Sequence, residues 1–345
     1  MNFETIDTTV RALWRYDYDT NIKPLRDLYE VAKKEQWNAA TDIPWEIETD
    51  PEQVGDMSAP GAEPFDFVKA LPKEKQIELA KRKSAHLLST FLHGEQGAMM
   101  ICGQLVEVVP DMDGKLYAST QVIDEARHVE VFHRYIQRLD RIYPIMPGLK
   151  ALLNAVLQAE LWQEKCVGMQ VIAESLAMGS FKTMIKLTND EVFRRVVELT
   201  AQDEARHVSY GLIYMKEEIP KMNERDRDQL EDFAWTAMTL LATTPQLREG
   251  EEAVDPMAVV FDDLGIDPKR AADEMASRMS DPEFVKAQPN PFRDYAYPQL
   301  ERIGLLTERT LSKYREAGLA ARTGGADAAG FPQSGAHVTG DLHTV

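Results

Sequence analysis

A hexapeptide that occurs twice constrains this chain more than any other feature of its sequence. Asp-Glu-Ala-Arg-His-Val fills positions 124–129 and again positions 203–208, a shift of 79 residues. Each copy contains a Glu-x-x-His pair. Residues i and i+3 of a helix are neighbours on one face, so each pair can present a carboxylate and an imidazole to one ion. The repetition predicts a binding site that is built from two similar halves.

A further glutamate stands thirty positions before the glutamate of each pair. At about 1.5 Å per helical residue, the two glutamates of each half lie at nearly the same height, roughly 18 to 21 Å from the break between their helices. Four carboxylates and two imidazoles suit iron or manganese better than structural zinc. Four carboxylates also balance two divalent cations in charge. The predicted metal ligands are Glu95, Glu125, His128, Glu174, Glu204 and His207.

The hydrophobic pattern predicts an all-α fold built on a four-helix bundle. Helical periodicity persists after Pro72 and is interrupted at Pro110, Pro144 and the Asn189-Asp190 pair, where Asp190 is expected to cap the next helix. Short connections make long helices antiparallel neighbours. No strand-like alternation of any length appears. The four helices are expected at residues 73–109, 113–143, 149–188 and 190–219.

We predict four segments along the chain. An N-terminal wrap with a short helix at residues 24–37 precedes the bundle, additional helices pack on it, and a Gly/Ala/Ser-rich flexible tail follows. The segments are 1–72, 73–220, 221–317 and 318–345. The additional helices are expected at residues 224–247, 256–264, 268–279 and 298–317.

Charge and composition exclude several classes of partner. The net charge of −18 argues against nucleic acid and against an anionic membrane surface. No run of about 18 apolar residues and no signal peptide is visible. Cys102 and Cys166 lack metal-type spacing, so we interpret them as buried free thiols in a reducing cytosol. We therefore expect a cytoplasmic protein.

The ligand pattern resembles that of the ferritin-like di-iron carboxylate superfamily, whose members use one Glu from each of two helices and a Glu-x-x-His from each of two others. The repeated Asp-Glu-x-Arg-His form is most similar to the bacterial multicomponent monooxygenase hydroxylases. The acyl-carrier-protein desaturases and ribonucleotide reductase small subunits are more distant. The resemblance covers roughly residues 73–220. It implies two iron ions, with Mn/Fe as an alternative, and one or two bridging glutamates. By the resemblance Glu95, Glu125 and His128 ligate mainly one ion, and Glu174, Glu204 and His207 the other.

The same resemblance gives roles to the residues beside the ligands. The aspartate before each ligand glutamate is expected to accept a hydrogen bond from a ligand histidine, which fixes the tautomer of the imidazole. We expect Asp124 to serve His207 and Asp203 to serve His128, with Arg127 and Arg206 paired to these aspartates.

Three positions distinguish the branches of the superfamily. A radical-generating subunit would have a tyrosine where this chain has Phe132, and the monooxygenases have a threonine where it has Met178. The arylamine N-oxygenases carry an added histidine one turn before the last Glu-x-x-His, where this chain has Thr200; the corresponding position of the first half holds Gln121. The branch therefore stays open.

The predicted function is an O₂-dependent di-iron oxidoreductase, most simply a monooxygenase or oxidase that acts on a small, largely apolar substrate. N-oxygenation and desaturation are alternatives on the same scaffold. A ferroxidase or iron-storage protein, and a metal-stabilised structural protein, are alternatives from other classes. No nucleotide-binding or iron–sulfur motif is visible, so a separate ferredoxin or reductase is expected to supply electrons. A homodimer is an open alternative.

The expected pocket residues are Phe91, Met99, Phe132, Gln170, Met178 and Thr200.

Overall fold

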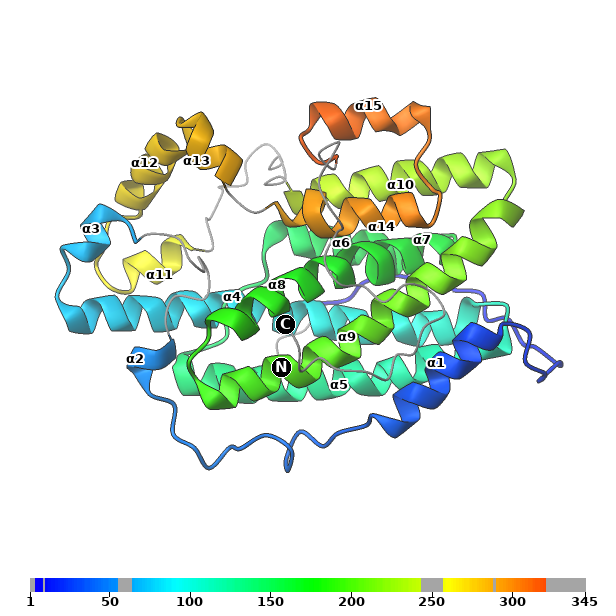
Figure 1. The fold of residues 1–345 in the computed structure, drawn as a ribbon, viewed down its shortest axis with the longest axis horizontal. Coiled ribbons are helices and arrows are strands. Elements are labelled where there is room, and N and C mark those ends of the chain that lie inside the picture. Colours follow the sequence, from blue (N-terminus) through cyan, green and yellow to red (C-terminus); the bar gives the residue numbers. More distant parts are fainter. Residues whose placement is uncertain (1–3, 9, 55–63, 243–256, 288–289, 321–345) are drawn as a thin grey trace.

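A bundle of long helices forms the centre of the protein (Figure 1). The structure is a computed structural model that describes residues 4–8, 10–54, 64–242, 257–287 and 290–320. Within these ranges the chain is helical and contains no strand, which confirms the predicted fold class. The bundle consists of α4 (Lys73–Val108), α5 (Met112–Leu139), α8 (Glu174–Leu187) and α9 (Glu191–Glu218).

Local signals in the sequence set several ends of these helices. Helix α4 ends just before Pro110, which cannot continue a helix. Asp190 caps α9 as predicted, since its carboxylate accepts a hydrogen bond from the Phe193 amide at 2.7 Å. A 3₁₀ turn, η2 (Ile219–Lys221), follows α9 and contains Pro220. These ends agree with the predicted ones to within a few residues.

The single helix predicted at 149–188 is wrong, because this stretch is broken. It comprises α6 (Pro147–Gln158), α7 (Trp162–Cys166), the π-helix η1 (Val167–Ala173) and α8. No Pro or Gly stands at the break after Gln158. The buried Lys165 ammonium instead donates to the Val156 and Leu157 carbonyls at 3.0 and 2.9 Å. These bonds satisfy carbonyls that the end of α6 would otherwise leave unpaired.

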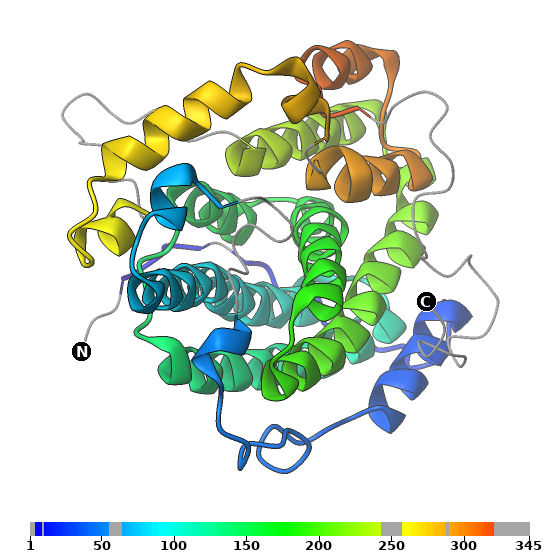
Figure 2. The ribbon, with the colours of Figure 1, turned by 60° about the vertical axis from the view of Figure 1, so that its left-hand side comes forward.

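Shorter helices cover the bundle. Helix α1 (Lys23–Lys34) lies along α5 and α9, and α2 (Pro51–Val54) and α3 (Asp66–Lys69) follow it. Figures 1 and 2 place α10, α14 and α15 together on one side of the bundle, and α11 to α13 near the start of α4. Their bounds are α10 (Glu224–Ala242), α11 (Ala258–Asp262), α12 (Pro268–Met279), α13 (Pro282–Ala287), η3 (Phe292–Ala296), α14 (Tyr297–Arg302) and α15 (Glu308–Glu316).

The helix predicted at 298–317 is two helices, α14 and α15. Gly304 between them has a φ of +70°, a conformation that glycine adopts readily and that ends a helix. The predicted residues 243–247 and 256, and the tail from residue 321 onward, lie outside the described residues.

A buried aspartate fixes the position of α1. Asp113, at the start of α5, accepts hydrogen bonds from the backbone amides of Asn21 and Ile22, both at 2.8 Å. It also accepts one from Arg26 Nε at 2.7 Å. These bonds hold the N-terminal end of α1 against α5, and the other end of α1 then lies over the centre of the bundle.

The buried apolar side chains form two clusters that lie on opposite sides of the predicted ligands. One cluster takes residues of α4 from Ala98 onward, while the other takes residues of α4 up to Leu92. Helix α9 is divided in the same way, at Leu199 and Tyr210. The predicted ligands therefore lie in a polar layer between two apolar cores. Every helix among the described residues is too short or too polar to cross a lipid bilayer.

Candidate metal centre

All six predicted ligands meet at the centre of the bundle and are buried. They come from four helices: Glu95 from α4, the first Glu-x-x-His from α5, Glu174 from the first position of α8, and the second Glu-x-x-His from α9. The π-helix η1 ends directly before Glu174. Such turns, with one extra residue, are frequent at functional sites.

The side chains form two groups that share two glutamates. One group is Glu95, Glu125, His128 and Glu204; the other is Glu125, Glu174, Glu204 and His207. In each group, one oxygen or nitrogen atom of every residue lies within 4.8 Å of the others. Glu125 and Glu204 belong to both groups.

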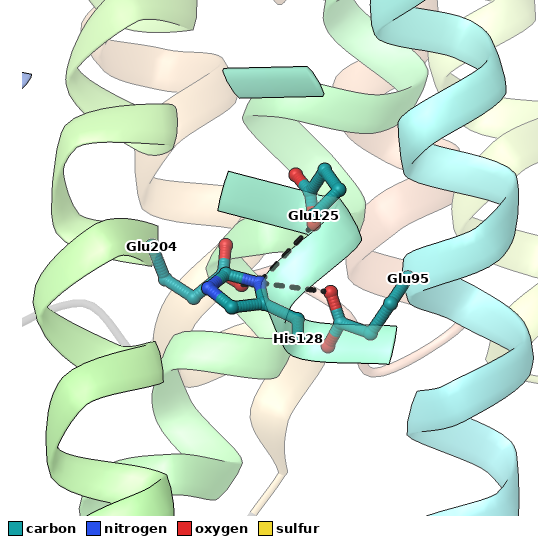
Figure 3. A group of neighbouring side chains, drawn as sticks. All are labelled: Glu95, Glu125, His128 and Glu204. Atoms are coloured by element: carbon teal, nitrogen blue, oxygen red, sulfur yellow. Dashed lines mark hydrogen bonds and ion pairs between the residues drawn. The ribbon is translucent and has the colours of Figure 1, made fainter. Parts of the chain in front are cut away.

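One nitrogen of each histidine faces the glutamates. Figure 3 shows the His128 ring between Glu95 and Glu125, with Glu204 beside it. His128 Nδ1 lies 3.3 Å from Glu95 Oε2 and 3.2 Å from oxygens of both Glu125 and Glu204. His207 Nδ1 lies 2.9 Å from Glu204 Oε2 and 3.2 Å from Glu125 Oε1. The two imidazoles therefore present equivalent nitrogens to the centre.

The other nitrogen of each histidine binds an aspartate of the opposite half. His128 Nε2 lies 3.1 Å from Asp203 Oδ2, and His207 Nε2 lies 3.3 Å from Asp124 Oδ2. Both expected pairings are present. Because a carboxylate accepts, each Nε2 carries a proton toward it, and Nδ1 is left free to bind a cation.

Two arginines neutralise the aspartates. Arg127 donates to Asp124 at 2.5 Å and to Asp203 at 3.1 Å. Arg206 donates to Asp203 and lies 3.6 Å from Asp124. With these four charges balanced, the four buried glutamates remain, and two divalent cations would neutralise them. The oxygen-rich donor set therefore fits two iron ions.

The pKa shifts of Glu95 and Glu174 show that their buried carboxylates are unfavourable without nearby positive charge. Burial raises the pKa of Glu95 and Glu174, and neighbouring carboxylates raise it further. Burial alone would lower the pKa of His207, but the charges of Glu204 and Glu125 raise it to about 10. A cation at the centre would therefore favour the ionised form of Glu95 and Glu174.

The segment directly after α1 contributes three residues that sequence reasoning missed. The Trp37 indole Nε1 donates to Asp203 Oδ2 at 2.7 Å, and the ring stacks at 6.4 Å from that of His128. Gln36 donates to Asp124 at 3.2 Å and accepts from Arg127 at 2.5 Å. Glu35 accepts from Arg206 at 2.8 Å. No motif in this segment marks these residues, which approach through the packing of α1.

The expected pocket residues divide between two ends of the site. Phe91, Phe132 and Phe181 pack together, with ring centroids 4.8 to 6.2 Å apart. This aromatic end is mostly buried, and Phe91 is partly exposed. Thr200, one turn before Glu204, is buried, and its hydroxyl has no hydrogen-bond partner in the part of the chain that the structure describes. Sequence reasoning did not include Phe181.

The opposite end is polar. Gln170 of η1 accepts a hydrogen bond from Gln121 Nε2 at 2.8 Å and donates one to Cys102 Sγ at 3.4 Å. Gly211 of α9 allows η1 to approach, since a Cβ there would lie 2.7 Å from Gln170 Cβ. Of the other two expected pocket residues, which are assigned to neither end, Met178 is buried and Met99 is partly exposed. The predicted free thiols are also present, since Cys102 and Cys166 are buried and unpaired.

The 79-residue shift relates the two ends position by position. Phe91 corresponds to Gln170, Phe132 to Gly211, Cys102 to Phe181, and Thr200 to Gln121. The repeat therefore keeps the six predicted ligands and the rest of the hexapeptide, and it changes the side chains at these four pairs of positions. The result is a symmetric centre with one aromatic and one polar end.

The fold and this centre define a ferritin-like di-iron carboxylate protein. Within that class, the family model described as "P-aminobenzoate N-oxygenase AurF" matches residues 20–295. The chain belongs to the AurF family. It is an oxidoreductase of the di-iron oxygenase and oxidase type. The cofactor is a pair of metal ions, as predicted.

The chain also resembles individual proteins, at low sequence identity. The uncharacterized protein Rv0885 of Mycobacterium tuberculosis (strain H37Rv) is 22% identical over 246 residues, which cover 64% of this chain and 69% of that protein. A solved R2-like ligand-binding oxidase with a Mn/Fe cofactor is 18% identical and covers 82% of this chain and 93% of its own, with a TM-score of 0.43. Another, from Sulfolobus acidocaldarius, is 17% identical, covers 75% and 92%, and has a TM-score of 0.45.

Proposed function

We propose that the six buried residues hold two iron ions, one in each of the two groups. The first ion takes Glu95 and His128, and the second takes Glu174 and His207. Glu125 and Glu204, which belong to both groups, would be shared by the two ions. The observation that carries this assignment is the sharing of two glutamates between two groups of closely spaced donor atoms. We call the place of the first ion the Glu95 position and that of the second ion the Glu174 position.

The bound irons supply the capacity to activate O₂, and the protein directs it. Asp203 and Asp124 keep the histidine protons on Nε2, so that both Nδ1 atoms face the ions. The two apolar cores exclude water from both sides of the polar layer. A dry site of fixed geometry lets a small molecule react in preference to solvent.

We propose that the substrate approaches from the aromatic end. Phe91, Phe132 and Phe181 provide apolar surface there, and the Thr200 hydroxyl has no hydrogen-bond partner among the described residues. These features suit a small, largely apolar molecule that carries one polar group. Monooxygenation of such a molecule is the function that the geometry supports best.

N-oxygenation of an amine is the second candidate, because the chain belongs to a family described by that reaction. The chain has Thr200 where the N-oxygenases carry an added histidine, and a hydroxyl can replace neither the charge nor the metal affinity of an imidazole.

The external electron donor, the homodimer and the cytoplasmic location stay predictions.

Metal content and oxygen consumption test the proposal together. Protein loaded anaerobically with Fe(II) should hold two ions per chain, and Glu204→Ala, which removes a bridging ligand, should hold fewer. With a chemical reductant, oxygen uptake should follow the oxidation of an organic substrate in a panel of amines, phenols and hydrocarbons. Uptake that follows only added Fe(II) would identify a ferroxidase instead. Wild-type protein that binds no second ion would refute the ligand assignment.

A further inference from the structure

The strongest departure from twofold symmetry at the centre is the pair Gln121 and Thr200. Each lies one turn before a bridging glutamate, on α5 and α9 respectively, and each is fully buried. The Gln121 amide nitrogen lies 3.0 Å from Glu125 Oε1 and 3.3 Å from Glu174 Oε1. Thr200 makes no hydrogen bond with the corresponding glutamates. Among the described residues, a neutral donor therefore lies between the carboxylates of one half of the centre and not of the other.

The chemistry of the neighbours fixes the orientation of the Gln121 amide. Glu125, Glu174 and Gln170 each place an oxygen atom within 3.3 Å of the Gln121 amide nitrogen, and the NH₂ group is oriented toward these oxygens. Gln170 then holds Gln121 from the side of η1, at 2.8 Å. The pair forms a fixed donor rather than a mobile side chain.

The oxygens that Gln121 contacts belong to the Glu174 position. Glu125 Oε1 lies 3.2 Å from His207 Nδ1, and Glu174 Oε1 lies 3.9 Å from the same nitrogen. A donor between two carboxylates lowers their mutual repulsion and keeps both oxygens directed at one point. The Glu174 position is thus arranged before a metal arrives.

The Glu95 position lacks such a donor. Within the described residues, Glu95 makes its hydrogen bond to His128, whose Nδ1 must release that contact when a metal binds. Glu95 itself lies one turn after the partly exposed Phe91 of the aromatic end. No neutral donor among the described residues holds the Glu95 carboxylate in place, so the ion must order this carboxylate when it binds. The cost of that ordering reduces the free energy of metal binding.

We infer that Gln121 is a positioning residue that makes the two metal positions unequal, so that the Glu174 position binds its ion first and more tightly. The weaker Glu95 position then lies next to the aromatic end. This inference rests on the proposed two-ion centre and adds an order of loading to it. Loss of a hydrogen bond to a ligand typically weakens metal binding about 10- to 100-fold, and we expect a difference of that size between the positions.

Titration of the metal-free full chain with Co(II), followed by visible absorbance under anaerobic conditions, tests the inference. Wild-type protein should bind two ions in two phases. Glu95→Gln should remove the weaker phase and Glu174→Gln the tighter one, which assigns the phases. Gln121→Met, which keeps the shape and removes the donor, should weaken the tighter phase by about 10-fold or more and leave the weaker phase unchanged.

Thr200→Val is the matched control, because it alters the symmetry-related position. It should leave both phases intact. An unchanged tighter phase in Gln121→Met, or equal weakening of both phases, would overturn the inference while leaving the two-ion centre in place. Wild-type protein that binds fewer than two ions would overturn the proposed function instead, so the two failures are distinguishable.

Discussion

His128 and Asp203 belong to different halves of the repeat, yet they form one unit, with Nε2 and Oδ2 3.1 Å apart. His207 and Asp124 form the equivalent unit at 3.3 Å. Each half therefore supplies the carboxylate that orients the histidine of the other. Neither half can form its metal position alone.

Asp203→Asn should weaken metal binding about 10- to 100-fold, because an amide can present a donor where His128 needs an acceptor. The loss should fall mainly on the Glu95 position, which contains His128. Asp124→Asn should affect the Glu174 position in the same way. Metal-binding isotherms of the two variants measure this, and identical isotherms for both would contradict the crossed assignment.

Removal of the metals should destabilise the protein. Two bound ions neutralise four buried glutamates, and at a free concentration 100 times Kd each ion adds about 2.7 kcal/mol to the free energy of unfolding. Scanning calorimetry with and without Mn(II), under chelated and loaded conditions, should show a higher Tm for the loaded protein. Glu204→Ala should lose most of this shift. The absence of any shift in wild-type protein would contradict a buried two-ion centre.

Trp37→Phe should lower both metal affinity and stability, the latter by about 1 kcal/mol, because it removes the hydrogen bond to Asp203. Trp45 is a matched control from the same segment. It is also buried, but its indole donates to the Ala39 carbonyl at 2.7 Å, away from the centre. Trp45→Phe should cost similar stability and leave the metal isotherm unchanged. Denaturant unfolding and Co(II) titration of both variants give the comparison.

Lys165→Met should change the pH dependence of stability. Burial lowers the pKa of Lys165 to about 8, below its value of about 10.4 in an unfolded chain. Between these two values the unfolded state binds more protons, so this residue makes wild-type stability rise with pH across the window. Urea unfolding at pH 7.5 to 10 should show a rise relative to the variant.

Lys115 offers the control for that experiment. Its ammonium donates to the Val106 and Glu107 carbonyls at 2.8 and 2.9 Å, the same arrangement that Lys165 makes at the end of α6. Lys115 is only partly buried. Lys115→Met should therefore show a weaker pH effect. An equal effect in the two variants would mean that burial of Lys165 is not the cause.

Gly211→Ala should destabilise the protein by about 1 to 3 kcal/mol, since the new Cβ would meet Gln170 Cβ at 2.7 Å. Gly103, in α4, has nothing within 4 Å of a built Cβ. Gly103→Ala should be neutral or stabilising by up to about 1 kcal/mol. Thermal unfolding of the two variants measures the difference, and a destabilised Gly103→Ala would contradict this packing argument.

The gathering of the six expected ligands and most of the long helices could be predicted, because their signals are local and repeated. The Glu-x-x-His pairs lie within one helical turn, and Asp190 marks the start of α9. The crossed aspartate pairs followed from the family resemblance. Applying the 79-residue shift to every position would also have paired Phe181 with Cys102.

The parts that could not be predicted depend on distant contacts. Trp37 reaches Asp203 across 166 residues, through the anchoring of α1 on Asp113. The break after α6 depends on the Lys165 side chain, which donates to a carbonyl at the end of that helix, and no Pro or Gly marks the position. An unbroken helical pattern fits one long helix equally well, so only the packed structure distinguishes the two.

The polar layer between the two apolar cores has a mechanical consequence. Most of the attraction that holds each core together is confined to its own end of the bundle. The long helices α4, α5 and α9 run through both ends of the bundle. Between the two cores, these helices are held to one another by the charged network of the centre. Filling that network with cations would turn two adjoining halves into one cooperative folding unit.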